Sequence, residues 1–413
     1  MNFISLLNSS SSYLLTICRL SASIGFLLPL YFIIPAAYMM DRTQNLERVA
    51  EKLPSCRDED TKDIKIENCI GFTRVPLGLA GPLTIHGESK RTVYAPLATV
   101  EPTLVASCSR GCKAFQATGG IQVTTLSEGL SRAPVFIFRT VNDALQFYYR
   151  VPTLKHLFDA SSDKTSRYVR LIEVTPHIIG RTVHVKFQYT CGDAAGQNMV
   201  TIATHRACQD FLHSISSKDL GIVDFQIEGQ ISSDKKLSWG NVKDPRGIEV
   251  MAWGTLSDPV CREILGCSTT RLRSVIARFE DGSTRNGQMG QNINTANAMA
   301  AMFISCGQDA ASVFESGWSH LTADLDEETK VLTLSLYIPS LLVGTVGGGT
   351  HYPSQRESLE LIGCYGDGKK WALAETITAF ALALDVSTVS AIANDTFAAS
   401  HQNLARGLPR SKL

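Results

Sequence analysis

The spacing of apolar and polar residues predicts a mixture of strands and helices in the middle of this chain of 413 residues. PVFIFRTV (134–141), RYVRLIEVTP (167–176) and RTVHVKFQYT (181–190) have the composition of strands, and the last one alternates apolar and polar positions. LQFYYRVPTLKHLF (145–158) and NMVTIATHRACQDFLHSI (198–215) have helical spacing. Strands and amphipathic helices that alternate in this way predict a compact α+β unit.

The segments around this unit are richer in Ala and Gly. GFTRVPLGLAGPLTIHG (71–87) is divided by Gly and Pro into short apolar strands, and LTLSLYIPSLLV (332–343) is also strand-like. INTANAMAAMFISCGQDAAS (293–312) and KKWALAETITAFALALDV (369–386) are apolar on all sides, which is typical of helices inside a large domain. The pattern predicts a small α+β domain inserted in a larger helical one.

The first part of the chain differs from the rest. SASIGFLLPLYFIIPAAYMM (21–40) is an uncharged run of about the length that a bilayer core requires. Arg19 is the only charged residue before Asp41, and cations are more frequent after the run, which places the main part of the chain in the cytosol. We therefore expect a membrane anchor with its flank at 1–45; a cleaved signal peptide is the alternative.

The two ends of the chain indicate different cellular addresses. Residues 46–66 are charged and predict a tether with a short helix. With the single span at 21–40, the expected location is the endoplasmic reticulum membrane. The C-terminal tail, 408–413, ends in Ser-Lys-Leu, the tripeptide that peroxisomal import receptors bind. A peroxisomal location is therefore the alternative.

Composition and charge narrow the class of protein. Apolar residues make up 44% of the chain and charged residues 19%, as in a globular protein, and its length predicts two domains. Lys plus Arg equal Asp plus Glu at 39 each, so no overall field attracts the chain to nucleic acid. The 11 cysteines form no C-x-x-C pair, which favours reduced thiols and excludes a zinc site of the usual spacing.

Several short motifs have both a chemical and a structural interpretation. The turn in CGDAAGQNMVT (191–201) precedes a helix whose N–H groups can hold a phosphate, or it simply connects a strand to a helix. The glycines of GTVGGGTHYP (344–353) allow close approach of a ligand or form a tight turn. ISSDKKLSWG (231–240) is a charged loop that is either solvated or part of a site.

Three single residues have the same ambiguity. Glu101 precedes an apolar helix, where a carboxylate caps the helix or, if buried, donates a proton. Asp309 is expected inside an apolar helix, and an unpaired carboxylate there is costly, so we expect a lysine partner. His401 follows a long apolar helix and is either structural or catalytic.

Together and in this order, the motifs resemble the 3-hydroxy-3-methylglutaryl-coenzyme A (HMG-CoA) reductase family. The resemblance covers about residues 64–407, and DKK and CGQDAA are similar to the eukaryotic class (class I), here with a truncated membrane region. The motifs that carry it are ENCIGF, PLGLAGPLTI, Glu101 with LVAS-x-x-RGC, GDAAGQNM, DKK, CGQDAA, GTVGGGT and a terminal Ser-His.

The resemblance implies an α+β fold with two domains. A large helical domain, 67–133 and 227–407, would bind the coenzyme A thioester, and a small ferredoxin-like domain, 134–226, would bind NADPH. The active site would be shared across a dimer, so a homodimer or homotetramer is expected. The implied reaction is the four-electron reduction of HMG-CoA to mevalonate with two NADPH, which feeds isoprenoid and sterol biosynthesis.

The resemblance also implies roles for individual residues. Lys235 would stabilise an oxyanion, Glu101 would relay a proton, Asp309 would join Glu101 to Lys235, and His401 would protonate the coenzyme A thiolate. The expected NADPH residues are Asp193, Ala195, Gly196, Gln197 and Asn198, and the expected substrate residues are Arg132, Asp234, Lys236, Asn297 and Ser400. No metal is implied.

The sequence departs from the family pattern where the acyl group would bind. A serine that binds the substrate carboxylate is replaced by Glu228, a lysine with the same function by Arg278, and a histidine by Asn294. The glycine after the catalytic acid is Pro102, and Gly407 replaces a phosphorylatable serine. A reductase of a related acyl-CoA, or a weakly active paralogue that binds coenzyme A thioesters, is therefore the alternative.

Overall fold

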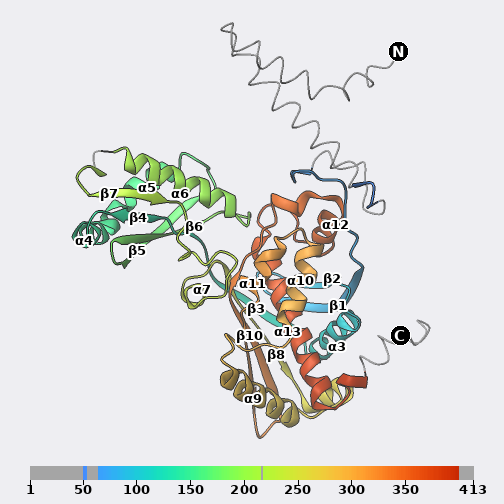
Figure 1. The fold of residues 1–413 in the computed structure, drawn as a ribbon. Helices are drawn as coiled ribbons and strands as arrows, with labels where there is room; N and C mark the ends of the chain where they lie inside the picture. The colour runs from blue at the N-terminus through green and yellow to red at the C-terminus, as the bar shows by residue number, and fades with distance from the viewer. Residues whose placement is uncertain (1–49, 54–63, 215–216, 400–413) are drawn as a thin grey trace, which may run out of the picture. The chain divides into compact units, whose positions relative to one another are not determined.

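A computed structural model describes residues 50–53, 64–214 and 217–399 (Figure 1). The chain divides into two compact units, Met1–Val75 and Pro76–Leu413, and every helix and strand named below belongs to the second. The expected anchor at 21–40, Ser400, His401 and the C-terminal Ser411–Leu413 lie outside the described residues.

One long strand, β3 (Ile121–Arg132), joins two sheets into a continuous ladder. Its first part pairs antiparallel with β8, and Leu130–Arg132 pair antiparallel with β6. The strand order is β7-β4-β6-β3-β8-β10-β9, and β1 pairs with β2 and β3 while β5 pairs with β6. The other strands are β1 (Leu77–His86), β2 (Lys90–Ala98), β4 (Val135–Phe138), β5 (Arg170–Ile179), β6 (Thr182–Thr190), β7 (Ile222–Gln226), β8 (Gly247–Leu256), β9 (His320–Leu325) and β10 (Leu332–Leu341).

The larger hydrophobic core surrounds α13 (Lys370–Ala393), whose residues are almost all buried (Figure 1). At Gly111 of α3 a Cβ atom would lie 1.8 Å from the carbonyl oxygen of Ala383, so only glycine permits the close contact with α13. Within the described part of the chain, α13 is the only helix long and apolar enough to cross a membrane, and 94% of its apolar window is buried in the protein. The other helices of this core are α3 (Leu104–Ala117), α9 (Thr269–Asn286), α10 (Thr295–Ser305) and α12 (Pro353–Leu361).

The prediction of a large helical domain was wrong in one respect. The core around α13 also contains β1, β2, β8, β9 and β10, which together with the first part of β3 form one sheet. In β10 the second half, Ile338–Leu341, is buried on both faces, so its period-two pattern disappears where the strand is most enclosed. The α+β class itself is confirmed.

The smaller core lies between β4–β7 and three helices, α4 (Val141–Arg150), α5 (Lys155–Ser162) and α6 (Gln197–Leu212). The strands expected at 134–141, 167–176 and 181–190 correspond to β4, β5 and β6, and both expected helical segments are helical. An aromatic cluster fills this core, with the ring of Phe136 5.0 Å from that of Phe147 and 6.1 Å from that of Phe211. The ferredoxin-like topology stays a prediction.

A buried carboxylate on α13 fixes the start of α10. Asp385 is completely buried, and it accepts hydrogen bonds from the N–H groups of Ile293 and Asn294 and from the hydroxyl of Thr295. Burial, partly offset by these hydrogen bonds, raises the pKa of Asp385 to about 6. The carboxylate thus fixes the two residues that lead into α10 and the hydroxyl of its first residue, at the cost of desolvation.

We expect Asp385→Asn to change how stability depends on pH. Between the ordinary pKa of 3.8 and about 6, the folded protein keeps a proton that the unfolded chain has released. The free energy of unfolding of the wild type, relative to the variant, should therefore fall by about 2 kcal/mol from about pH 4.5 to about pH 7.5. Urea unfolding at several pH values measures this difference.

Thr378→Val, at another buried polar position on α13, provides the control because threonine does not titrate. Its stability difference from the wild type should stay constant over the same range. A difference for Asp385→Asn that is constant or rises with pH would contradict the assignment.

Candidate active site

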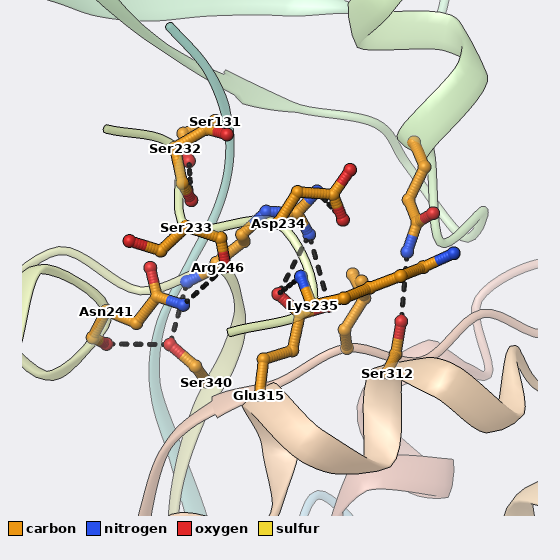
Figure 2. Close-up of polar contacts among 12 residues, drawn as sticks. Ser131, Ser232, Ser233, Asp234, Lys235, Asn241, Arg246, Ser312, Glu315 and Ser340 are labelled. Carbon is orange, nitrogen blue, oxygen red and sulfur yellow. Dashed lines mark hydrogen bonds and ion pairs between the residues drawn. The ribbon is translucent and has the colours of Figure 1, made fainter. Parts of the chain in front are cut away.

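The loop between β7 and α7 (Trp239–Lys243) carries the basic group that the sequence singles out. The Nζ atom of Lys235 lies 3.0 Å from Oδ2 of Asp309, and both side chains are partly exposed, at 42% and 37%. The expected lysine partner of Asp309 is therefore confirmed. In Figure 2 Asp234 lies beside Arg246, and the side chain of Lys235 extends away from them.

The expectation that Asp309 lies inside an apolar helix was wrong. Helix α10 ends at Ser305, and Asp309 caps the following 3-10 turn, where its carboxylate accepts a hydrogen bond from the N–H of Ala311. Gly307 has a positive φ of 68° and lies against the backbone of Gly349, so the helix cannot continue there. Because the helix ends before Asp309, the carboxylate of Asp309 is free to pair with the ammonium of Lys235.

Asp234 is held by a buried arginine at the end of β3. Nη1 of Arg132 lies 3.2 Å from Oδ2 of Asp234 and also 3.2 Å from Oε2 of Glu228. The side chain of Arg132 is only 9% exposed, and a buried guanidinium requires such partners. The structure therefore brings together the predicted residues Arg132, Asp234, Lys235 and Asp309.

Glu228, the main departure from the family pattern, is turned toward protein donors. Besides Arg132, its carboxylate accepts hydrogen bonds from the hydroxyl of Ser232 (2.8 Å) and from the N–H groups of Gln230 (2.6 Å) and Ala133 (3.4 Å). An acid with these donors is a structural partner of Arg132. Its negative charge is largely compensated before any ligand binds.

Two other cations that the sequence singled out, Lys236 and Arg278, are exposed. Lys236 is exposed, and its ammonium donates to the carbonyl oxygen of Asp234. Arg278 lies on the exposed side of α9. Within the described residues neither makes an ion pair with a carboxylate.

Glu101 belongs to a second location, at the opposite end of α10. It is exposed, three residues before α3 begins, and lines a cavity of about 270 Å³ together with Ser107, Arg110, Asn294 and Thr388. Asn297 joins this group because its amide donates to Oδ1 of Asn294. The 11 residues of α10 rise by about 16 Å between Asn294 and the turn that leads to Asp309.

In the part of the chain that the structure describes, no hydrogen bond or ion pair joins Glu101 to the cluster around Lys235. The prediction that Asp309 joins Glu101 to Lys235 is therefore not met by a single chain. Asn294, which replaces a histidine of the family pattern, donates from its amide to Thr388 and from its N–H to Asp385.

The turn predicted to bind a cofactor is anchored to the larger core. The carboxylate of Asp193 accepts hydrogen bonds from the N–H groups of Gly368 and Lys370, at the start of α13. Gly196, with a φ of 81°, precedes the first turn of α6, where Gln197 donates to the hydroxyl of Ser312. Ala195 lies against Gly344, and Asn198 is exposed in the first turn of α6.

The glycine-rich segment after β10 lies beside this turn. Ala194 pairs with Val346, and Gly344 exchanges two hydrogen bonds with the side chain of Gln308. At Gly344 a Cβ atom would lie 2.3 Å from the N atom of Ala195, which explains why glycine is required. The segments 191–198, 306–309 and 344–346 therefore converge.

The sequence analysis missed several residues at these locations. Ser107 and Arg110 were quoted only as part of a motif, although they line the cavity with Glu101. Arg167 and Tyr168 form a cation–π pair 4.8 Å apart beside Gly192, and Arg246 and Glu315 are buried beneath Lys235. A lone arginine before a strand carries no sequence signal of burial, so only the fold reveals the last two.

Comparisons with known proteins agree with the resemblance. Residues 38–406 match the family model described as hydroxymethylglutaryl-coenzyme A reductase. The HMG-CoA reductase of Methanocaldococcus jannaschii is 35% identical over 345 residues, which cover 83% of this chain and 84% of that protein. The reductase of Aeropyrum pernix is 36% identical over 349 residues, 83% of this chain and 82% of that protein. The reductase of Schistosoma mansoni is 33% identical over 375 residues, 88% of this chain and 38% of that protein.

Solved structures show the same fold. The class II HMG-CoA reductase of Streptococcus pneumoniae bound to NADPH superposes with a TM-score of 0.64 at 18% identity, covering 87% of this chain and 96% of that one. The family model spans most of the chain, and archaeal relatives above one-third identity match over most of their own length. This chain belongs to the hydroxymethylglutaryl-coenzyme A reductase family.

Proposed function

We propose that this chain reduces HMG-CoA to mevalonate and coenzyme A with two NADPH and two protons. Two hydride transfers convert the thioester carbonyl to the alcohol, with loss of the coenzyme A thiolate. The observation that carries the proposal is the ion pair between Lys235 and Asp309, in a chain of this family. Each hydride creates negative charge on an oxygen, and a fixed ammonium stabilises that charge.

Asp309 directs the ammonium of Lys235. A carboxylate oxygen 3.0 Å from the ammonium restricts the rotamers of the lysine side chain. Because both side chains are partly exposed, a substrate carbonyl has access to them. His401 would return a proton to the departing thiolate, and Ser400 would lie beside it; both are proposed from the sequence alone.

The turn at 191–198 fits a dinucleotide. Asp193 and Gly196 place the exposed N–H groups of the first turn of α6 at the surface, where a phosphate is attracted by the helix dipole. Tyr168 and Arg167 add an exposed aromatic ring and a guanidinium beside Gly192. NADPH, when bound, supplies the hydrides; these residues bind and orient it.

The two locations at the ends of α10 support an active site shared by two subunits. Glu101 with its cavity would come from one chain, and Lys235 with Asp309 from the other. Arg110 and Ser107 give this cavity a cation and a hydroxyl, which suit the polar arm of coenzyme A. Chains therefore assemble in pairs or in pairs of pairs.

A related acyl-CoA is the second candidate substrate. Glu228 already pairs with Arg132, a cation that the resemblance places near the substrate. Asp234, Lys236 and Asn297 would then carry a larger share of acyl-group binding. We therefore expect a thioester whose acyl group lacks a carboxylate to bind better to this site than to the sites of other family members.

We also propose that the chain is a class I reductase with a single membrane anchor. The class rests on the DKK and CGQDAA motifs, and the anchor on the uncharged run at 21–40. The endoplasmic reticulum is the proposed location and the peroxisome the alternative, because of the terminal Ser-Lys-Leu.

Lys235→Ala tests whether the ammonium stabilises the oxyanion. The purified wild type should oxidise NADPH only when HMG-CoA is added and should release mevalonate, detected by mass spectrometry. Lys235→Ala should reduce kcat by about 100-fold or more, since it removes the charge that stabilises the oxyanion. Lys243→Ala, at an exposed lysine on α7, should remain within about twofold of the wild type.

Two outcomes would contradict this assignment. Substantial activity in Lys235→Ala would remove the lysine from the mechanism. A wild type that ignores HMG-CoA but oxidises NADPH with another acyl-CoA would select the second candidate.

Heterodimers test whether Glu101 of one subunit and Lys235 of the other form one active site. Glu101→Gln and Lys235→Ala homodimers should both be inactive. A heterodimer of the two variants, purified through two different tags, contains one site with both native residues. Its activity should be about half that of the wild-type dimer, because the two-fold symmetry gives two sites. An inactive heterodimer would show that both residues act within one chain.

Truncations at the two ends test the proposed cellular location of the chain. The full chain should stay with membranes after a carbonate wash, whereas a chain that lacks residues 1–45 should be released, because the anchor is removed. Imaging after deletion of Ser411–Leu413 should give an unchanged reticular pattern. A shift from peroxisomes to the cytosol on that deletion would favour the alternative.

A further inference from the structure

The backbone around Lys235 is held in an unfavourable conformation. Gln230, Ser233 and Lys235 have positive φ values of 71°, 54° and 55°. Each non-glycine residue in this region costs on the order of 1–2 kcal/mol, so surrounding contacts must impose the conformation. Lys235 is the residue whose ammonium pairs with Asp309, and the strain therefore lies in the part of the loop that presents this group.

Glu315 of α11 (Val313–Ser316) makes the contact that fixes Lys235 itself. Its side chain is completely buried, and Oε2 accepts a hydrogen bond from the backbone N–H of Lys235 at 3.3 Å. Burial raises the pKa of Glu315, and the neighbouring Arg246 opposes this effect. The carboxylate is therefore a buried acceptor directed at the main chain of the loop.

Arg246 joins Glu315 to the preceding residue of the loop. Its side chain is 0% exposed; Nη1 lies 3.2 Å from Oε2 of Glu315, and Nη2 lies 2.9 Å from Oδ1 of Asp234. The guanidinium of Arg246 thus contacts the carboxylate of Asp234 in the loop. It also contacts the carboxylate of Glu315, which accepts the N–H of Lys235. Figure 2 shows Arg246 between Asp234 and Glu315.

The backbone beside Arg246 is fixed as well. Its N–H donates to the hydroxyl of Ser340 in β10, and this hydroxyl donates to the carbonyl oxygen of Asn241. The amide of Asn241 donates to the carbonyl oxygens of Ser233 and Lys236. The loop is therefore tied to the larger sheet on both sides of Lys235.

We infer that Arg246 and Glu315 are positioning residues for Lys235, which together hold its backbone so that its ammonium meets Asp309. This inference rests on the proposed function for its effect on turnover. A buried ion pair contributes little net stability compared with apolar residues of similar volume. What this pair provides is a defined conformation of the loop. Arg246 holds the carboxylate of Asp234, and the carboxylate of Glu315 holds the N–H of Lys235.

The test is Glu315→Gln, which keeps the shape and removes the charge. The matched control is Glu375→Gln on α13. Glu375 is 2% exposed, pairs with Arg91 at 3.2 Å and accepts a backbone N–H bond from Glu88 at 2.9 Å, so it has the same kinds of partners away from Lys235. Burial raises the pKa of both carboxyl groups.

Both variants should lower Tm, because each removes a carboxylate partner from an arginine, Arg246 in one case and Arg91 in the other. Only Glu315→Gln should lower kcat, by about tenfold or more, with KM for HMG-CoA within about threefold of the wild type. Equal effects of the two variants on kcat would overturn the inference.

A double variant, Arg246→Met with Glu315→Gln, separates positioning from stability. It removes both charges and so recovers Tm relative to Glu315→Gln. kcat should stay low, because no carboxylate holds the N–H of Lys235. Recovery of kcat together with Tm would reduce the pair to a structural role.

Hydrogen exchange tests the inference without any substrate. A peptide that contains residues 230–237 should exchange faster in Glu315→Gln than in the wild type or in Glu375→Gln. If the wild type fails to turn over HMG-CoA and this difference is still found, the proposed function fails and the positioning stands. Equal exchange in all three proteins would overturn the positioning.

Discussion

Asp234 lies between two arginines, and the arrangement depends on the pairing of the strands that carry them. In the antiparallel pair β3 and β8, Gly129 is opposite Gly247, so Arg132 leaves β3 at the edge where Arg246 enters β8. Arg132 and Arg246 each contact one carboxylate oxygen of Asp234. Because β3 also pairs with β6, this carboxylate is fixed where the ladder passes from the larger core to the smaller one.

This contact has consequences for Lys235, the next residue of the loop. Removal of one partner from a buried ion pair typically costs about 3–5 kcal/mol, because a charge then remains without compensation in a medium of low polarity. Asp234 is therefore held firmly, and the following residue, Lys235, is forced into a left-handed backbone conformation. The ammonium itself stays partly exposed, so the strain is confined to the backbone while the charged group remains accessible.

The sequence predicted the parts of this arrangement that depend on local pattern. The strands β4, β5 and β6 and the helices beside them follow from spacing. A lysine partner of Asp309 was predicted too, although the premise of a buried carboxylate was wrong, because Asp309 is 37% exposed. The end of α10 was missed because it results from contact between Gly307 and Gly349, which are distant in sequence. Arg246 and Glu315 were missed for the same reason, since their burial arises only when β8, β10 and α11 come together. The domain boundaries and the roles of individual site residues stay predictions.

Glu228 and Asn294, which depart from the family pattern, are both hydrogen-bonded to other parts of the protein. Glu228 would place a negative charge beside a substrate carboxylate, yet its oxygens are engaged by Arg132, Ser232 and two backbone N–H groups. Asn294 is likewise engaged, through Thr388 and Asp385. Each replacement is thus accommodated by partners on other elements, and neither disturbs the ion pair between Lys235 and Asp309. The surface proposed to bind the acyl group can therefore change while Lys235 and Asp309, proposed to stabilise the developing negative charge, keep their geometry.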